Sequence, residues 1–145
     1  MDSCEFCAGV GGTVLWESAT WRVVLVEDSD YPGFCRVVWT AHVREMTDLA
    51  PGERIALMNV VFAVEEVVRS LFAPDKMNLA SLGNMTPHVH WHVIPRWQDD
   101  RHFPGPIWAS PQREPLRRRP VVSADAMRRA LREQLHPDEP QGGQP

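Results

Sequence analysis

The sequence predicts an α+β fold with five β-strands, one long α-helix and a short C-terminal helix. Two observations carry this prediction. Five short segments are rich in β-branched and aromatic residues, or alternate apolar and polar residues, which is typical of strands. One longer segment repeats its apolar residues every three or four positions, which is typical of a helix. With 145 residues, 43% of them hydrophobic, the chain can bury a core of its own.

The first three expected strands lie in the N-terminal part of the chain. They cover residues 13–17, 20–26 and 34–40. Val, Thr and Trp dominate these segments, and such residues fit the pleated surface of a sheet. A Gly-Gly pair precedes the first strand, and a loop ending in Pro32 and Gly33 precedes the third, so each strand is bounded by residues that favour turns.

The long helix and two further strands follow. The helix is expected to begin near Pro51, which suits a first helical turn, and to end before Pro74. Its apolar stripe is most simply the face that packs on the sheet. The fourth strand is expected over residues 77–82, and the fifth in the stretch 87–95, with a Gly-Asn turn between them.

The chain is expected to form one domain over residues 1–110, with a C-terminal extension over residues 111–136. Ser123 can cap a short helix in that extension, because the apolar residues after it recur at four-residue steps. Residues 137–145 are polar and rich in Pro, Gly and Gln, which predicts a disordered tail.

Composition excludes several functions. The formal net charge of −4 argues against a general nucleic-acid surface, and the one basic run, Arg117 to Arg119, is better explained as a solvated segment than as a phosphate site. No apolar run approaches the roughly 20 residues of a membrane span. The N-terminus starts acidic and lacks an apolar stretch, so we expect no signal peptide and a cytoplasmic protein.

Three histidines in five positions are the most informative motif. His88, His90 and His92 alternate with apolar residues, which is the period of a strand, so their imidazoles are expected on one face. Neutral imidazole is a nucleophile near pH 7, and a row of such rings can form a reactive surface. Two alternatives stay open: ordinary strand histidines, or His-x-His ligands of a catalytic metal ion.

The stretch His88–Ile94 resembles the signature of the histidine triad (HIT) superfamily, His-φ-His-φ-His-φ-φ with φ apolar. The resemblance extends over residues 4–108, through the order of strands and helix. Residues 31–39 and 99–108 are similar to bacterial proteins known as diadenosine-polyphosphate hydrolases. The resemblance implies a five-stranded antiparallel sheet with the long helix packed on it. It also implies a homodimer with a continuous sheet.

The resemblance further implies a nucleotide hydrolase or transferase that acts at the α-phosphate of a nucleoside 5′-phosphate derivative. Such a substrate is a dinucleoside polyphosphate or a nucleoside phosphoramidate, here of a purine. Carried over by position, His90 is the nucleophile that forms a covalent nucleotidyl-histidine, and His88 and His92 support it. No catalytic cofactor is required for this chemistry.

Family positions that contact the substrate map onto three polar residues. Asp28 corresponds to an acidic residue that accepts hydrogen bonds from the ribose hydroxyls, and Asn78 to an asparagine near the phosphates. Asn84 stands where other members have Gln, so it keeps an amide donor on a shorter arm. Met85 replaces the usual Ser or Thr and has no proton to give, which leaves the protonation of the leaving group to Thr86, to water or to no group at all.

Cys4 and Cys7 have the spacing of a zinc half-site, although reduced free thiols or a redox pair share that spacing. Candidates for the remaining ligands are His42 and His88. Some bacterial HIT proteins and the related galactose-1-phosphate uridylyltransferases are similar in this respect, which implies a structural zinc ion. Two other functions remain open: a zinc-dependent hydrolase that uses the histidines as ligands, and a nucleotide-binding protein without catalysis.

Overall fold

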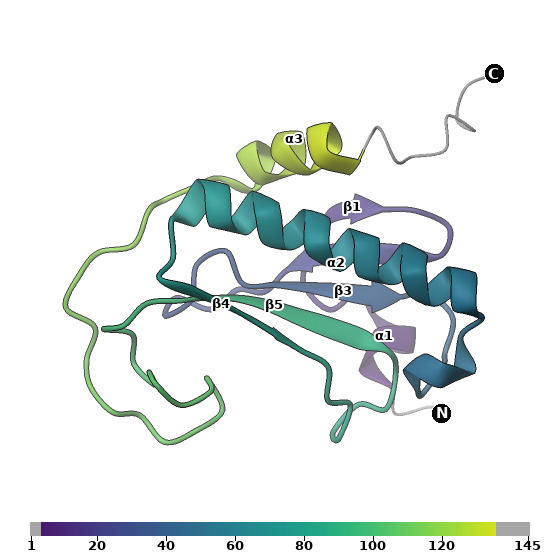
Figure 1. The fold of residues 1–145 in the computed structure, drawn as a ribbon, viewed down its shortest axis with the longest axis horizontal. Helices are drawn as coiled ribbons and strands as arrows, with labels where there is room; N and C mark the ends of the chain where they lie inside the picture. Colours follow the sequence, from purple (N-terminus) through teal and green to yellow (C-terminus); the bar gives the residue numbers. More distant parts are fainter. Residues whose placement is uncertain (1–3, 136–145) are drawn as a thin grey trace.

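The computed structural model describes residues 4–135, and it confirms the α+β fold (Figure 1). The strands are β1 (Thr13–Glu17), β2 (Trp21–Leu25), β3 (Cys35–Trp39), β4 (Lys76–Ala80) and β5 (His90–Arg96). The helices are α1 (Glu5–Ala8), α2 (Pro51–Phe72) and α3 (Ala124–Leu135), with a 3-10 turn η1 at Met46–Asp48. All strand pairs are antiparallel, in the order β1-β2-β3-β5-β4.

Helix α2 begins and ends at residues whose chemistry explains its limits. Pro51 occupies the first helical position, and the Glu53 carboxylate accepts the N–H of Ala50 at 2.7 Å, so one free donor of the first turn is satisfied. At the other end Ala73 adopts a left-handed conformation with φ 48°, and Pro74 follows. A proline cannot continue the helix, so the chain turns into β4.

The sheet has one face under the helices and one face that is largely free of them. α2 packs on β3 and β5, and α3 packs on α2 and β1, so α2 and α3 lie on the same side of the sheet (Figure 1). Apolar side chains of this side form the main core, including Val37, Val93 and Leu57. The short α1 instead lies against the other face, where Phe6 packs with Val38.

The C-terminal helix shares the main core. Met127, Leu131 and Leu135 are buried there, as their four-residue spacing predicts. The division between a domain over 1–110 and an extension over 111–136 stays a prediction, and the expected disordered tail lies outside the described residues. No helix within residues 4–135 combines the length and apolarity that crossing a membrane requires.

The fifth strand differs from expectation at its start. β5 begins at His90, so His88 lies in a bend before it. The neighbouring Val89 bonds to two segments: its carbonyl accepts the N–H of Trp39, at the end of β3, and its N–H donates to the carbonyl of Val43, in the loop after β3. His88 is therefore fixed by the loop after β3 as well as by its own strand.

Candidate active site and metal centre

His90 and His92 lie on the sheet face opposite α2. In the β3–β5 register they pair with Val38 and Arg36, respectively. Their ring centroids are 4.9 Å apart, and both side chains are more than 90% buried. The apolar residues that alternate with them, Trp91 and Val93, belong to the core on the helix side, as the period of two predicts.

A single hydrogen bond fixes the tautomer of His90. Its Nδ1 lies 2.6 Å from the main-chain oxygen of His88. A carbonyl oxygen only accepts, so Nδ1 carries the proton, and in the neutral ring Nε2 keeps the lone pair. Burial lowers the pKa of His90, although the bond to His88 works against this shift. His90 therefore presents a neutral imidazole with a free nucleophilic nitrogen.

The backbone of His90 is also anchored, by a residue that the sequence analysis missed. The hydroxyl of Ser81, just after β4, donates to the main-chain oxygen of His90 at 2.6 Å. A serine after a strand has no distinctive pattern, so only the pairing of β4 with β5 reveals this contact.

His92 is more buried than a histidine on a solvent-exposed strand would be. Its Nδ1 is buried without a hydrogen-bond partner among the described residues. Burial lowers the pKa of His92 to about 4, and the neighbouring His90 and Arg36 add to the shift. The rings of Phe34 and Trp108 lie 5.8 and 5.0 Å away. Trp108 comes from the loop after β5, and half of it remains exposed.

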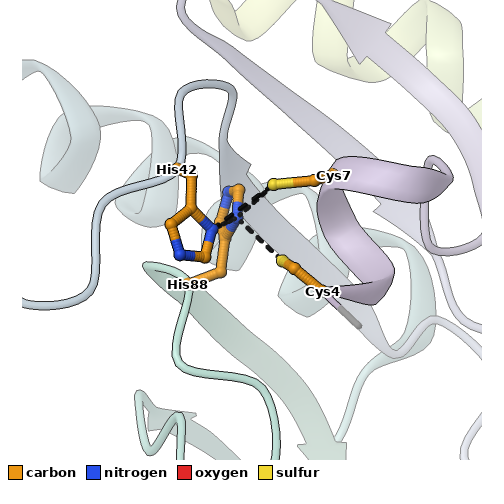
Figure 2. A group of neighbouring side chains, drawn as sticks. All are labelled: Cys4, Cys7, His42 and His88. Atoms are coloured by element: carbon orange, nitrogen blue, oxygen red, sulfur yellow. Dashed lines mark hydrogen bonds between the residues drawn. The ribbon is translucent and has the colours of Figure 1, made fainter. Parts of the chain in front are cut away.

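Four potential metal ligands meet at the edge of this face (Figure 2). Cys4 and Cys7 come from α1 and the residue before it, His42 from the loop after β3, and His88 from the segment before β5. Their nearest ligand atoms all lie within 4.8 Å of one another. Both histidines present Nδ1, 3.3 Å apart. The structure thus brings together the four residues that the sequence analysis selected.

The spacing of these atoms fits tetrahedral zinc. With zinc bonds of about 2.05 Å to nitrogen and 2.3 Å to sulfur, a tetrahedron has edges of about 3.3 Å between nitrogens and about 3.55 Å between nitrogen and sulfur. The corresponding distances here are 3.4 Å for Cys4 to His88, 3.3 Å for Cys7 to His42 and 3.6 Å for Cys7 to His88. Two thiolates and two imidazoles are a donor set that zinc favours.

A hydrogen bond to the main chain orients the ring of His88, the residue that belongs to the ligand set and whose carbonyl also accepts the proton of His90. Its Nε2 lies 2.6 Å from the main-chain oxygen of Trp39, to which it donates. That bond places the proton on Nε2 and leaves the lone pair on Nδ1, which faces the cysteines. Metal-binding histidines are commonly held in this way. All four tetrahedral positions would be filled by protein ligands, which is typical of a structural site.

The three predicted substrate residues are dispersed over the structure. Asp28 lies in the β2–β3 loop, where its Oδ1 accepts the N–H of Asp30 at 2.9 Å. It borders a cavity of about 480 Å³ whose lining includes Phe72 and Met127 from the helix side. Asn78 lies on β4, and its Oδ1 accepts a hydrogen bond from Arg96. Asn84 is exposed in the turn before the triad.

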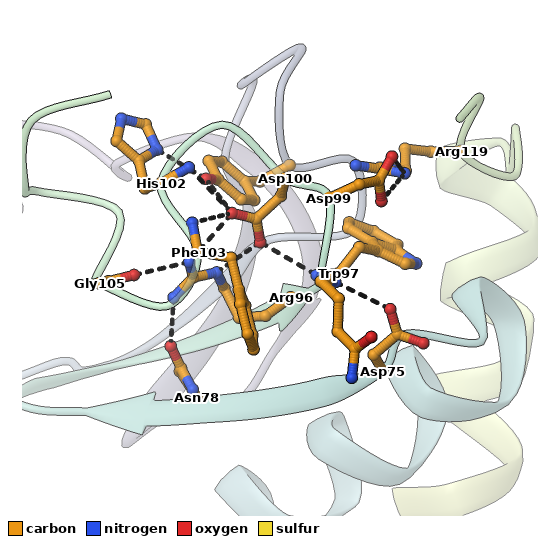
Figure 3. Close-up of polar contacts among 12 residues, drawn as sticks. Asp75, Asn78, Arg96, Trp97, Asp99, Asp100, His102, Phe103, Gly105 and Arg119 are labelled. Atoms are coloured by element: carbon orange, nitrogen blue, oxygen red, sulfur yellow. Dashed lines mark hydrogen bonds and ion pairs between the residues drawn. The ribbon is translucent and has the colours of Figure 1, made fainter. Parts of the chain in front are cut away.

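Arg96, the last residue of β5, holds the loop that follows the strand. Arg96 is 2% exposed, and its guanidinium binds the Asp100 carboxylate through two nitrogens (Figure 3). It also donates to Asn78 and to the Gly105 oxygen. Burial alone would raise the pKa of Asp100, but Arg96 and the surrounding N–H groups hold it at about 2. Arg96 thus organises the loop after β5.

The basic run after this loop is paired in part. Arg117 and Arg119 form ion pairs with Asp99, and the Arg119 guanidinium lies 4.6 Å from the centroid of the Trp97 ring. These contacts tie the segment that leads to α3 onto the domain.

Comparison with known proteins assigns this architecture to a family. A family model described as "HIT domain" matches residues 10–99. The chain belongs to the HIT-domain family. Over 74 residues it is 32% identical to the asymmetrical bis(5′-nucleosyl)-tetraphosphatase of Schizosaccharomyces pombe, a match that covers 48% of this chain and 41% of that protein. Over 78 residues it is 31% identical to an AP-4-A phosphorylase of Mycobacterium tuberculosis, covering 50% and 40%.

This HIT-domain chain spans about two fifths of the length of those curated relatives. Solved structures match more completely. A histidine triad protein from Marinobacter aquaeolei VT8 is 31% identical, with a TM-score of 0.66 and 93% of each chain covered. A Zn-bound histidine triad family protein from Mycobacterium smegmatis has a TM-score of 0.60 and covers 95% of this chain and 96% of its own. At 21% identity, that second likeness concerns the fold.

Proposed function

We propose that this HIT-domain protein cleaves a purine nucleoside 5′-phosphate derivative at its α-phosphate, with His90 as the nucleophile. The observation that carries the proposal is the hydrogen bond from His90 Nδ1 to the His88 oxygen, which leaves Nε2 free for attack. The curated relatives, whose printed names refer to dinucleoside polyphosphates, point to the same class of substrate.

The reaction then has two steps. In the first, the lone pair of His90 Nε2 forms a bond to the α-phosphorus, and the bond to the leaving group breaks with its electron pair. In the second, water attacks phosphorus, and the phosphorus–nitrogen bond returns its pair to Nε2. One water proton stays on the nucleotide product and the other passes to solvent. An N–H of His92 hydrogen-bonds a non-bridging oxygen and stabilises its charge.

The surroundings of the triad favour a leaving group that needs no proton. Met85 is 97% exposed and has no proton to give, and the Thr86 hydroxyl donates to the carboxylate of Glu5 at 3.1 Å. A polyphosphate departs as a stable anion, whereas the amine of a phosphoramidate must be protonated. We therefore expect dinucleoside polyphosphates to be the better substrates.

A structural zinc ion fits the proposal without entering the reaction. The ion would be held by Cys4, Cys7, His42 and His88, and it would stabilise the attachment of α1 to the sheet. The four ligands leave no open position, which disfavours a zinc-dependent hydrolase at this centre. His90 and His92 remain outside the ligand set.

The proposal also includes a cytoplasmic homodimer. β4 is an edge strand of the five-stranded sheet, and Ile55 and Phe62 of α2 are 64% and 49% exposed. An open strand edge and exposed apolar side chains each suit pairing of two copies. Light scattering during gel filtration tests the dimer, and a monomeric mass at micromolar protein would contradict it.

Release of AMP tests the function. The parent is incubated with diadenosine tetraphosphate and, separately, with adenosine phosphoramidate, and each is compared with His90→Ala. We expect turnover by the parent and a loss of at least about a thousandfold in the variant, because the covalent route is closed. His102→Gln is the matched control, since His102 contacts Tyr31 rather than the triad. An active His90→Ala would refute the nucleophile, and an inactive parent that binds AMP would favour the non-catalytic alternative.

A further inference from the structure

Arg36 is a charged residue within the otherwise apolar strand β3, and it lies directly across from His92, the neighbour of the candidate nucleophile His90. In the β3–β5 register it pairs with His92, so its side chain is on the same face as His92 and His90. Its guanidinium carbon lies 5.7 Å from the centroid of the Phe6 ring and 5.9 Å from that of Phe34. Those two rings also flank the histidines: Phe6 is 4.7 Å from His90, and Phe34 is 5.8 Å from His92.

The guanidinium of Arg36 is only partly satisfied by the protein. Nη1 donates to the main-chain oxygen of Gly11 at 3.2 Å, which is its one hydrogen bond to residues 4–135. Nε is buried without an acceptor, as is Nδ1 of His92 across the strand pair. No carboxylate within residues 4–135 forms an ion pair with Arg36. A buried donor without a partner, such as this Nε, costs free energy.

Two arginines that are more deeply buried than the half-buried Arg36 show the contrast. Arg22 lies on the same sheet face and donates to three main-chain oxygens, those of Val10, Phe6 and Gly9. Arg96 is held by Asp100. These guanidinium groups are used to hold loops in place, whereas the one beside the histidines retains free donors and forms no ion pair within residues 4–135.

We propose that Arg36 binds the phosphate oxygens of the nucleotide that His90 attacks. The inference rests on the proposed function, and it assigns the Arg36 guanidinium as the positively charged group that binds the phosphate at the same site. A guanidinium presents several N–H groups in a plane, which matches the oxygens of a phosphate, and the flanking rings hold it in place. During attack, negative charge grows on the non-bridging oxygens, so a fixed cation beside them stabilises the transition state as well as the bound nucleotide.

A comparison of AMP with adenosine isolates this contact, because the two ligands differ only in the phosphate. Binding is measured by calorimetry on the zinc-loaded parent, on Arg36→Met and on Arg132→Met. The last variant removes the same charge from an exposed position on α3, in the helix layer. AMP is a product of the proposed reaction, so no turnover disturbs the measurement. Loss of charged hydrogen bonds should lower AMP affinity about tenfold or more in Arg36→Met. Adenosine affinity should stay the same.

Each possible result of this binding comparison either supports or overturns the proposal. A selective loss of AMP affinity in Arg36→Met, absent from Arg132→Met, supports the proposal. Equal losses for AMP and adenosine mean a purely structural role and overturn it, as does unchanged AMP affinity. If Arg36→Met does not fold, AMP and adenosine binding are measured on Arg36→Lys instead. If that variant binds AMP as tightly as the parent does, the guanidinium is not needed and the proposal is refuted. If the parent cleaves diadenosine tetraphosphate and Arg36→Met binds AMP as tightly as the parent does, only this inference is refuted. If the parent binds no AMP, the proposed function itself is refuted.

Discussion

The main-chain oxygen of His88 accepts the Nδ1 proton of His90 at 2.6 Å, while the ring of the same His88 faces the sulfur of Cys4 at 3.4 Å. One residue therefore belongs to both the metal centre and the nucleophile's support. Its ring is fixed by Trp39 and the cysteines, and its carbonyl fixes the tautomer of His90. Disturbance of the metal centre should reach the nucleophile through a single peptide unit.

Loss of one thiol should remove zinc and loosen the N-terminal segment. Cys7→Ser leaves three ligands and no thiolate at that position, so we expect sub-stoichiometric zinc by elemental analysis and a lower Tm. Cys35→Ala is the matched control, because Cys35 is buried in β3 away from the ligand set. It should lose some stability and keep its zinc. Full zinc content in Cys7→Ser would contradict the proposed ligand.

Removal of zinc should reduce activity gradually. If zinc is structural, activity after addition of a chelator should decay in parallel with zinc loss and with the change in near-ultraviolet circular dichroism, because the fold must loosen first. A catalytic metal would instead give immediate inhibition that precedes any spectral change. Parallel time courses of AMP release, zinc release and circular dichroism separate the two.

Stability should fall on acidification within a defined range of pH. Burial lowers the pKa of His92 from 6.5 to about 4, with His90 and Arg36 contributing. Below pH 6.5 the unfolded chain binds a proton that the folded chain does not, so stability is lost as pH falls from 6.5 towards 4. His92→Gln should lose less over this range in urea unfolding. The pKa of Asp100, at about 2, lies below it. Equal pH dependence in both proteins would contradict the assignment.

The buried pair of Arg96 and Asp100 should carry more stability than any exposed pair. Arg96→Met leaves the Asp100 carboxylate buried without its guanidinium, and the expected loss is about 3–5 kcal/mol in urea unfolding. Arg101→Met breaks an exposed pair with Glu114 and should cost about 0–1 kcal/mol. Comparable small losses in both variants would show that the loop does not depend on the buried pair.

The sequence predicted the fold where periodicity and turn residues agreed. α2, bounded by Pro51 and Pro74, was found almost to the residue, and the alternating segment of β5 was found except for its start, because burial on one face imposes their periods. The four metal-ligand candidates were also found, since Cys-x-x-Cys is a local pattern and the resemblance supplied His42 and His88.

Features that depend on long-range contacts could not be predicted. The short α1 has too few residues for a periodic pattern, and it is held by Phe6 on the far face of the sheet. The burial of Arg96 could not be predicted, because its partner Asp100 belongs to a loop whose path no local rule fixes. Arg36 did leave a signal, a lone charge inside an apolar strand, which could have been recognised.

The position of Cys4 has a practical consequence for anyone who purifies this protein. Its thiol belongs to the candidate metal centre, and it is residue 4 of the sequence. A polyhistidine affinity tag fused directly before residue 1 would bring imidazoles that compete with that centre for its ion during nickel chromatography. A tag after residue 145, or one without histidine, avoids this interference.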